Sequence, residues 1–157
     1  MFTRLTTFTG ANNIDNAVTH LRDEGLPILN LQQGYCGVTV SAARSEGVLA
    51  ILSVWDSEAD REASESAVSK GRRDAAGLIG GDVTVETFEQ VVAEVNEPHI
   101  VGSPQIMIRI STDPANIDEN IAFFKSEILP QIETAPGLLV LRDMINRETG
   151  EGIVSSI

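Results

Sequence analysis

The chain has 157 residues, enough for one ordinary domain or two small ones, and its 42% hydrophobic and 22% charged residues are typical of a folded core. The net charge of −12 excludes nucleic acid as an expected partner, because the chain would repel a phosphate backbone, and it disfavours an anionic membrane for the same reason. The N-terminus has no apolar core of signal-peptide length and no apolar run approaches a membrane span, so the sequence predicts a soluble, cytoplasmic protein.

The first predicted elements are a strand and a broken helix. The stretch FTRLTTF (2–8) is rich in β-branched and aromatic residues, which predicts a strand. Asn12 or Asn13 then caps a helix whose apolar residues recur at helical spacing. Pro27 interrupts this helix, and a kink is expected there.

Two further strands and a second helix follow. GVTVSAA (37–43) and GVLAILSVW (47–55) predict strands joined by a tight turn, in which Gly47 can adopt a positive φ. Ser57, with Asp60 three residues later, resembles a capping box at the start of the second helix.

The chain contains the same unit about one and a half times. Adding 103 to each residue number aligns residues 4–54 with the C-terminal region without a gap. Under this offset Leu5 corresponds to Ile108, and the prolines of both helices coincide. The shared identities include Thr9 and Thr112, Asn13 and Asn116, Asp15 and Asp118, Glu24 and Glu127, Gly34 and Gly137, Arg44 and Arg147, and Gly47 and Gly150.

The repeat defines the expected domain organisation. DVTVETFEQVVAEV (82–95) predicts the fourth strand of the first unit. We therefore expect units at 1–95 and 105–157, separated by a proline- and glycine-containing linker at 96–104. The second unit stops after its third strand, so we expect the natural chain to continue past Ile157.

The predicted fold class is α+β, built from ferredoxin-like βαββαβ units. Each unit is expected to form an antiparallel sheet with both helices on one face. The other face needs cover, and the tandem repeat can supply it by intramolecular pairing of the two units. Association into a homo-oligomer is left open.

The segment GVLAILSVWDSEADREASESAV (47–68) resembles the strand–Trp–Asp/Glu–Ser–helix signature of the antibiotic biosynthesis monooxygenase (ABM) domain superfamily. The resemblance covers 2–95, and 105–157 match its first part. It implies a dimeric α/β-barrel-type arrangement formed by the tandem repeat. It also implies that an organic substrate or heme is held between sheet and helices.

The activities known in this superfamily depend on residues that this chain lacks. Heme-degrading members carry an asparagine on the first strand and a histidine on the second helix, and residues 2–8 and 57–77 contain neither. Cofactor-free polyketide oxygenases use an asparagine shortly before the tryptophan and a tyrosine shortly after it. Here Ile51, Leu52 and Ser53 precede Trp55, and no tyrosine follows. We therefore predict no cofactor and leave the activity open.

Four residues are candidates for a ligand site. Trp55 either packs the strand against the helix or lines a pocket. His20 corresponds to Phe123 in the repeat, so it is expected to be half-buried, either as a candidate base or as a satisfied or solvent-facing side chain. Tyr35 is a candidate to point its hydroxyl into the pocket. Arg4 is either an anchor for an acidic or carbonyl ligand or a surface residue.

No pattern in the sequence predicts a metal site. Cys36 is the only cysteine, and no CxxC or His/Cys cluster accompanies it. We expect Cys36 to be a small core residue. The basic cluster KGRRD (70–74) is expected to be solvated on a helix surface.

These observations leave three functions open. The first is an ABM-like protein that binds a small apolar or aromatic organic molecule between sheet and helices. The second is a cofactor-independent monooxygenase acting on an electron-rich aromatic or quinol, which supplies its own electrons. The third is a structural or interaction protein with a filled core. A cavity would favour the first two, and a base within reach of the cavity would favour the second.

Overall fold

The computed structural model describes residues 1–98 and 101–157 and divides the chain into two compact units. Unit 1 is Met1–Thr87 and unit 2 is Phe88–Ile157. The division falls inside strand β4 (Asp82–Val95), because the second half of this strand pairs within unit 2.

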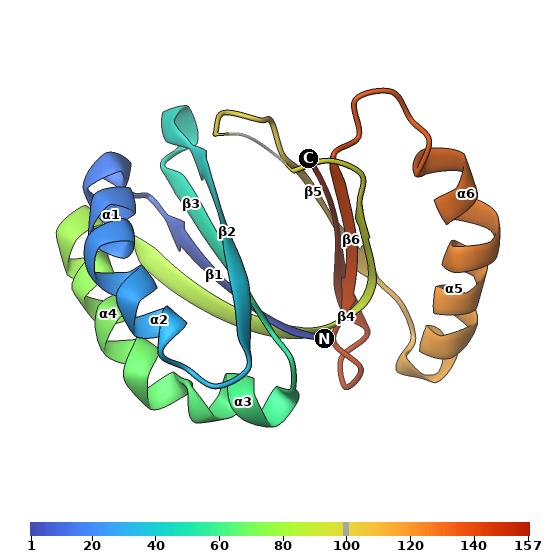
Figure 1. Ribbon diagram of the computed structural model, residues 1–157, viewed down its shortest axis with the longest axis horizontal. Helices are drawn as coiled ribbons and strands as arrows, with labels where there is room; N and C mark the ends of the chain where they lie inside the picture. Colours follow the sequence, from blue (N-terminus) through green and yellow to red (C-terminus); the bar gives the residue numbers. More distant parts are fainter. Residues whose placement is uncertain (99–100) are drawn as a thin grey trace. The chain divides into compact units, whose positions relative to one another are not determined.

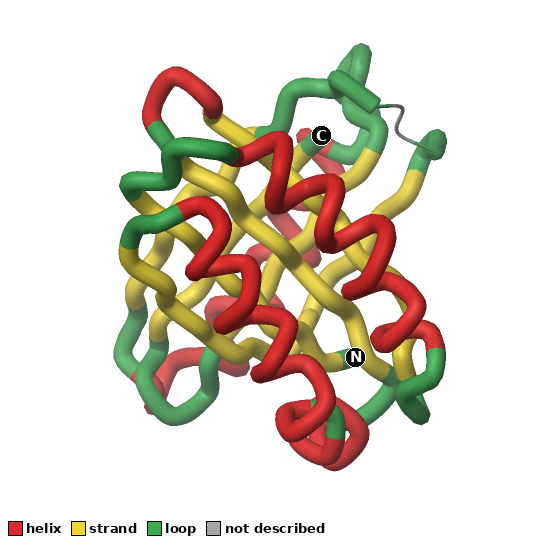
Figure 2. Tube along the Cα trace, turned by 90° about the vertical axis from the view of Figure 1, so that its left-hand side faces the viewer, coloured by secondary structure: helices red, strands yellow, loops and turns green. Residues whose placement is uncertain are grey.

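Unit 1 has the predicted βαββαβ order. Its strands lie in the order β2-β3-β1-β4, and both β1 and β2 pair antiparallel with β3. Figure 2 shows the helices of this unit lying across one face of its sheet. The α+β, ferredoxin-like fold class is therefore confirmed. The elements before β4 are β1 (Phe2–Thr9), α1 (Ile14–His20), α2 (Leu26–Asn30), β2 (Tyr35–Ala43), β3 (Val48–Trp55), α3 (Glu58–Ala63) and α4 (Glu65–Ile79).

Two local predictions in unit 1 are confirmed by hydrogen bonds and backbone angles. The Ser57 hydroxyl accepts a hydrogen bond from the backbone N–H of Asp60 at 3.0 Å, as a helix cap does. Gly47 ends the turn between β2 and β3 with φ = 66°, a left-handed angle that favours glycine. Its carbonyl accepts a hydrogen bond from the N–H of Ala11 at 2.9 Å, which ties the turn to the loop after β1.

The expected kink near Pro27 takes the form of a π-helical turn. Residues Leu21–Gly25 form this turn between α1 and α2. A turn of the same kind, Phe124–Ile128, precedes Pro130 in unit 2. In each turn one backbone N–H bonds the carbonyl five residues earlier, so one extra residue is accommodated before the helix continues.

Unit 2 contains the counterparts of the first three strands and the first helix. The second half of β4 pairs with β6, β6 with β7, and β7 with β5, all antiparallel. Its helices cover one face of these strands (Figure 1). His99, which the sequence places in the linker, lies outside the described residues. The elements are β5 (Ile106–Ser111), a 3₁₀ turn (Pro114–Asn116), α5 (Ile117–Phe123), α6 (Leu129–Ile132), β6 (Val140–Ile145) and β7 (Glu151–Ser156).

The gapless alignment of the two units is wrong in their first strand. In unit 1, Thr6 lies opposite Ile51. Val154 is the counterpart of Ile51, yet its partner on β5 is Ile108, so Ile108 corresponds to Thr6 and not to Leu5. The strand is therefore shifted by one residue. The 3₁₀ turn after β5 takes up the additional residue before the helix begins.

The core of unit 1 lies between its sheet and its helices. Phe8 and Leu49 point from the sheet toward Ala17 and Ile79 of the helices, and all four are buried. Within the residues that the structure describes, no helix combines the length and apolar character that crossing a membrane requires.

Candidate ligand cavity

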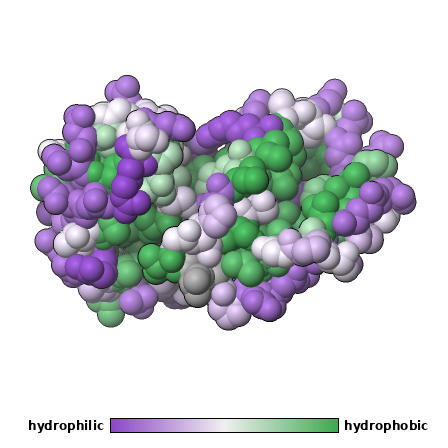
Figure 3. All heavy atoms as spheres, turned by 90° about the horizontal axis from the view of Figure 1, so that it is seen from above, coloured by the Kyte–Doolittle hydropathy of each residue, from purple (hydrophilic) through white to green (hydrophobic). Residues whose placement is uncertain are grey.

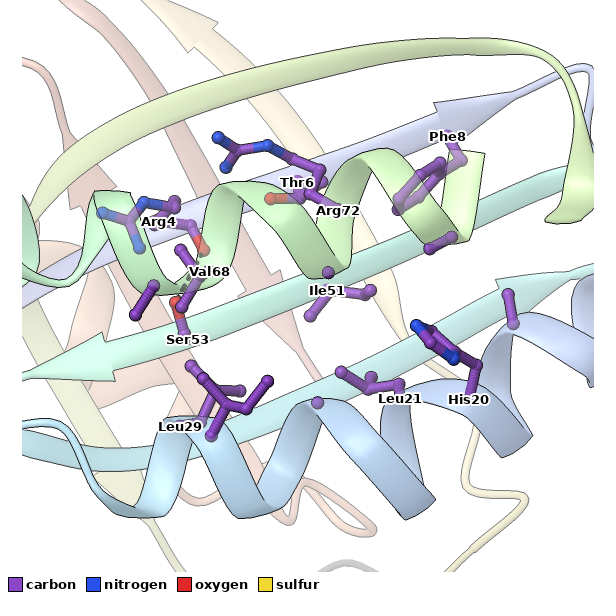
Figure 4. A pocket seen from close by; sticks show the side chains of 16 residues that line it. Arg4, Thr6, Phe8, His20, Leu21, Leu29, Ile51, Ser53, Val68 and Arg72 are labelled. Atoms are coloured by element: carbon purple, nitrogen blue, oxygen red, sulfur yellow. Dashed lines mark hydrogen bonds between the residues drawn. The ribbon is translucent and has the colours of Figure 1, made fainter. Parts of the chain in front are cut away.

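A cavity of about 90 Å³ lies in unit 1 between the sheet and the helices (Figure 4). Its floor comes from β1 and β3, and its walls come from the α1–α2 helix and from α4. The sequence resemblance placed a ligand in this layer. The lining is largely apolar and includes Phe8, Ala17, Leu21, Leu29, Ile51 and Ala75.

Five polar side chains interrupt this apolar lining. They are Arg4, Thr6, His20, Ser53 and Arg72. Among the described residues, no carboxylate lines the cavity. The polar groups are therefore hydroxyls, two guanidinium groups and an imidazole, a set that favours a neutral or anionic ligand carrying oxygen acceptors.

Arg4 is buried at one end of the cavity. Its Nη1 donates a hydrogen bond to the Ser64 hydroxyl at 3.0 Å, and its Nη2 donates to the carbonyl of Arg61. The same Nη2 lies 3.2 Å from a carboxylate oxygen of Glu65. Burial lowers the pKa of Arg4, and the charge of Glu65 opposes this effect. Arg4 therefore ties β1 to the α3–α4 junction, which excludes the surface alternative.

Trp55 is completely buried beside Arg4 and does not itself line the cavity. Its indole N–H donates to the hydroxyl of Ser53 at 3.0 Å. The Arg4 guanidinium lies 5.6 Å from the centre of its ring, and Tyr35 packs edge-on at 5.5 Å between ring centres. Burial raises the pKa of Tyr35. Trp55 and Tyr35 thus form a cluster that supports Arg4 and Ser53, both of which line the cavity.

His20 lines the cavity from α1, at the end away from Arg4 in Figure 4. Its side chain is 15% exposed, and its Nδ1 lies 3.4 Å from a carboxylate oxygen of Glu24 one turn later. A carboxylate in this position can orient the imidazole ring. Of the four candidates, the structure therefore places Arg4 and His20 in the cavity and Trp55 and Tyr35 behind Arg4.

Arg72 lies in the cavity wall, although the sequence predicted a solvated cluster there. Its side chain is 16% exposed and pairs with Glu65, whereas Lys70 of the same cluster is largely exposed. A signal was present in the sequence, because Arg72 lies four residues after Val68 and three before Ala75, on one face of α4.

Cys36 is exposed, so the prediction of a small core residue is wrong. Its thiol donates a hydrogen bond to a carboxylate oxygen of Asp56 at 3.2 Å. Desolvation and the neighbouring Asp56 both raise the pKa of the thiol, which keeps it protonated. Cys36 therefore lacks the low pKa of a reactive cysteine.

The cavity does not fit heme. Pockets that enclose drug-sized ligands have volumes of about 300–1,000 Å³. A cavity of about 90 Å³ is several-fold smaller, and a porphyrin exceeds a typical drug in size. A mechanism through a bound heme therefore has no support in this unit.

Comparisons with known proteins show relatives across the whole chain. The uncharacterized protein Rv2557 of Mycobacterium tuberculosis (strain ATCC 25618 / H37Rv) is 26% identical over 157 residues, which cover 99% of this chain and 70% of the relative. The uncharacterized protein Rv2558 of the same strain is 23% identical over 143 residues, covering 91% of this chain and 61% of its own length. No protein-family model matches the chain.

Solved structures share the fold over nearly the whole chain. A crystal structure from Lactobacillus acidophilus NCFM, of a protein named "putative monooxygenase", has a TM-score of 0.72 at 10% identity and covers 99% of this chain and 75% of its own. The crystal structure of an "anthrone oxidase-like protein" has a TM-score of 0.62 at 18% identity. The match covers 99% of this chain and 71% of that protein's chain. These likenesses show that the chain shares an α+β fold with both structures over nearly its whole length.

Proposed function

We propose that unit 1 binds a small apolar or aromatic organic molecule in the cavity between its sheet and its helices. The observation that carries this proposal is an apolar cavity with Arg4 toward one end, His20 toward the other and Thr6 between them. An aromatic ring would lie among the apolar side chains, and an oxygen of the ligand would point toward Arg4 and the hydroxyl of Thr6. A purely structural protein with a filled core has no need of such a space.

The size of the cavity limits the ligand. An apolar cavity of about 150 Å³ holds a molecule such as benzene. At about 90 Å³ the cavity of unit 1 is smaller than that, so we expect its side chains to move apart when a single ring enters. We therefore expect single-ring phenols or quinols to bind better than fused-ring compounds.

A second function, cofactor-independent monooxygenation, is supported by the fold shared with structures that carry monooxygenase names. In this reaction His20 would accept the O–H proton of a bound phenol or quinol. The resulting phenolate would reduce O₂ at a ring carbon and form a hydroperoxide there, which loses water to leave a carbonyl. One ring C–H, one O–H and one O₂ thus give two C=O groups and one H₂O, and the substrate supplies all the electrons.

The binding proposal is tested by filling the cavity from α4. Gly71 lines the cavity, and a Cβ added there meets no other atom within 4 Å, so Gly71→Leu should occupy the space without strain. Gly77→Leu is the matched control, because Gly77 lies in the same helix, has equal space and lies outside the cavity lining.

The measurement is ligand-detected NMR with a set of single-ring phenols and quinols. We expect binding to the unaltered protein and to Gly77→Leu, and its loss in Gly71→Leu. No binding at all, or equal binding to both variants, would contradict the proposal. For any ligand found, oxygen consumption should fall at least about 100-fold in His20→Gln while affinity changes little. If a ligand binds but no oxygen is consumed, the proposal of ligand binding stands and the proposal of an oxygenase activity is wrong.

A further inference from the structure

Two largely buried guanidinium groups share one carboxylate at the cavity of unit 1. Arg4 of β1 and Arg72 of α4 both line the cavity, and in Figure 4 their guanidinium groups point away from His20. One carboxylate oxygen of Glu65 lies 3.2 Å from Nη2 of Arg4, and the other accepts a hydrogen bond from Nη2 of Arg72. Glu65 is 45% exposed and lies outside the lining. Two positive charges therefore face one negative charge at this end of the cavity.

The second positive charge is not balanced by the neighbouring helix. Arg61, a third buried guanidinium group close to Arg4, pairs with two glutamates of its own helix at 3.0 and 3.5 Å. Burial lowers the pKa of Arg4, the positive charges of Arg72 and Arg61 lower it further, and the charge of Glu65 opposes them. An anion that entered the cavity would relieve this repulsion between arginines.

Both arginines keep hydrogen-bond donors for such an anion. A guanidinium group has five N–H donors. Arg4 directs three of them to the Ser64 hydroxyl, the carbonyl of Arg61 and the Glu65 carboxylate. Arg72 directs one to Glu65. Within the part of the chain that the structure describes, the other N–H groups of these two arginines have no side-chain or backbone acceptor.

Thr6 adds a third donor to the cavity. It is only 8% exposed and lines the cavity on β1, two residues after Arg4. Among residues 1–98 and 101–157, nothing forms a hydrogen bond with its hydroxyl. A buried hydroxyl without a partner is costly, so a ligand that accepts from it would be favoured.

The overall charge of the chain acts in the opposite direction. Hydrophilic residues dominate the face seen in Figure 3, and acidic residues outnumber basic ones by 23 to 11. At long range a net charge of −12 repels an anion. A preference of this protein for an anionic ligand would therefore have to come from the local contacts in the cavity.

We propose that the ligand of unit 1 is an organic carboxylate. Its apolar body lies among the apolar side chains, and its carboxylate accepts hydrogen bonds from Arg4, Arg72 and Thr6, because a planar carboxylate matches the paired N–H groups of a guanidinium. This inference rests on the function proposed above, since it names the chemical class of the molecule in the same cavity. A phenol with a carboxylate opposite its hydroxyl satisfies both, with the hydroxyl toward His20.

The test uses 4-hydroxybenzoate as the probe and 4-hydroxybenzamide as its uncharged counterpart. Affinities for the full chain are measured by isothermal titration calorimetry at pH 7. We expect the benzoate to bind at least about ten-fold more tightly than the amide, as hydrogen bonds between charged groups imply. Thr6→Val, which removes the unpartnered hydroxyl at nearly constant volume, should weaken binding of the benzoate about three- to ten-fold.

The charge is tested with two neighbouring arginines of α4. In Arg72→Gln the preference for the benzoate should fall at least about five-fold. Arg73→Gln is the matched control, because it removes the same charge from an exposed residue outside the lining, and there the preference should persist. Circular dichroism checks that the variants are folded.

Three outcomes would overturn the proposal. One is an equal affinity of the unaltered chain for the two compounds; if both then fail to bind Gly71→Leu, binding in the cavity stands and only the carboxylate is wrong. Another is an equal fall of the preference in Arg72→Gln and Arg73→Gln, which would show an effect of overall charge. The third is the absence of binding of either compound. If other single-ring phenols or quinols bind nonetheless, the function proposed above stands without the carboxylate.

Discussion

The two units of the chain share one plan but treat the layer between sheet and helices differently. Unit 1 closes this layer with α4 and lines the remaining cavity with arginines, hydroxyls and a histidine. Unit 2 buries a carboxylate, Asp143, in the same layer. The difference teaches that duplication preserved the hydrogen-bonded framework while the side chains facing the helices changed in charge.

The largest effect should come from Trp55→Ala in unit 1. Trp55 is fully buried and contacts Arg4, Ser53 and Tyr35, so its loss should lower the free energy of unfolding by about 3–5 kcal/mol. Phe123→Ala in unit 2 is the matched change at an exposed aromatic residue and should cost under about 1 kcal/mol. Urea denaturation measures both. Equal losses of unfolding free energy in the two variants would contradict the expected difference between a buried and an exposed aromatic ring.

Asp143→Val should raise the free energy of unfolding, whereas the two substitutions above lower it. Desolvation raises the pKa of the Asp143 carboxyl group from 3.8 to about 6, so its ionised form destabilises the folded chain. This cost is absent below about pH 4, grows as the pH rises, and reaches about 3 kcal/mol above pH 6. Asp143→Val, which restores the residue of unit 1, should therefore raise the free energy of unfolding by about 3 kcal/mol more at pH 8 than at pH 4.

Urea denaturation at the two pH values checks this prediction, with Glu119→Gln as the control for the loss of a negative charge. The control should show a far smaller difference between the two pH values, because Glu119 is exposed. A gain in Asp143→Val that does not depend on pH would show that packing, and not the ionised carboxylate, causes it.

The turn glycines of the two units should differ in their tolerance of a side chain. A Cβ on Gly150 would lie 1.9 Å from the carbonyl oxygen of Thr112, whereas a Cβ on Gly47 would lie 3.0 Å from that of Ala11. Both glycines have a positive φ, 75° and 66°. Gly150→Ala should cost about 2–3 kcal/mol and Gly47→Ala about 1 kcal/mol, measured as above. The reverse order would contradict the closer approach in unit 2.

The smallest effect should come from Ile108→Thr, and it tests the shifted register. Ile108 corresponds to Thr6 by strand pairing and is exposed, so the change should alter the free energy of unfolding by less than about 0.5 kcal/mol. If Ile108 instead matched the buried Leu5, as the gapless alignment holds, the loss would exceed about 2 kcal/mol.

The sequence predicted the repeat, the order of elements and the fold class, because hydrophobic spacing and capping residues specify local structure. It did not predict the one-residue shift of β5. The strand β5, in which isoleucine alternates with other residues, can be moved by one position without losing its strand character, and only pairing with β7 decides the register. The turn that absorbs the shift, Pro114–Asn116, is visible only in the structure.

The sequence predicted part of the cavity. The comparison of His20 with Phe123 indicated a half-buried imidazole, and His20 lines the cavity. The same comparison does not indicate that Asp143 is buried, because its counterpart Val40 is 36% exposed. The cluster of Trp55, Tyr35 and Arg4 depends on side-chain directions across three strands, which spacing along the chain does not determine.

The π-helical turns record the order of evolutionary events. Both copies contain this one-residue expansion, at Leu21–Gly25 and Phe124–Ile128, immediately before a Leu–Pro pair. An insertion of this kind in two copies is explained by a single event in their common ancestor. We infer that the ancestral unit acquired the extra residue before the gene was duplicated.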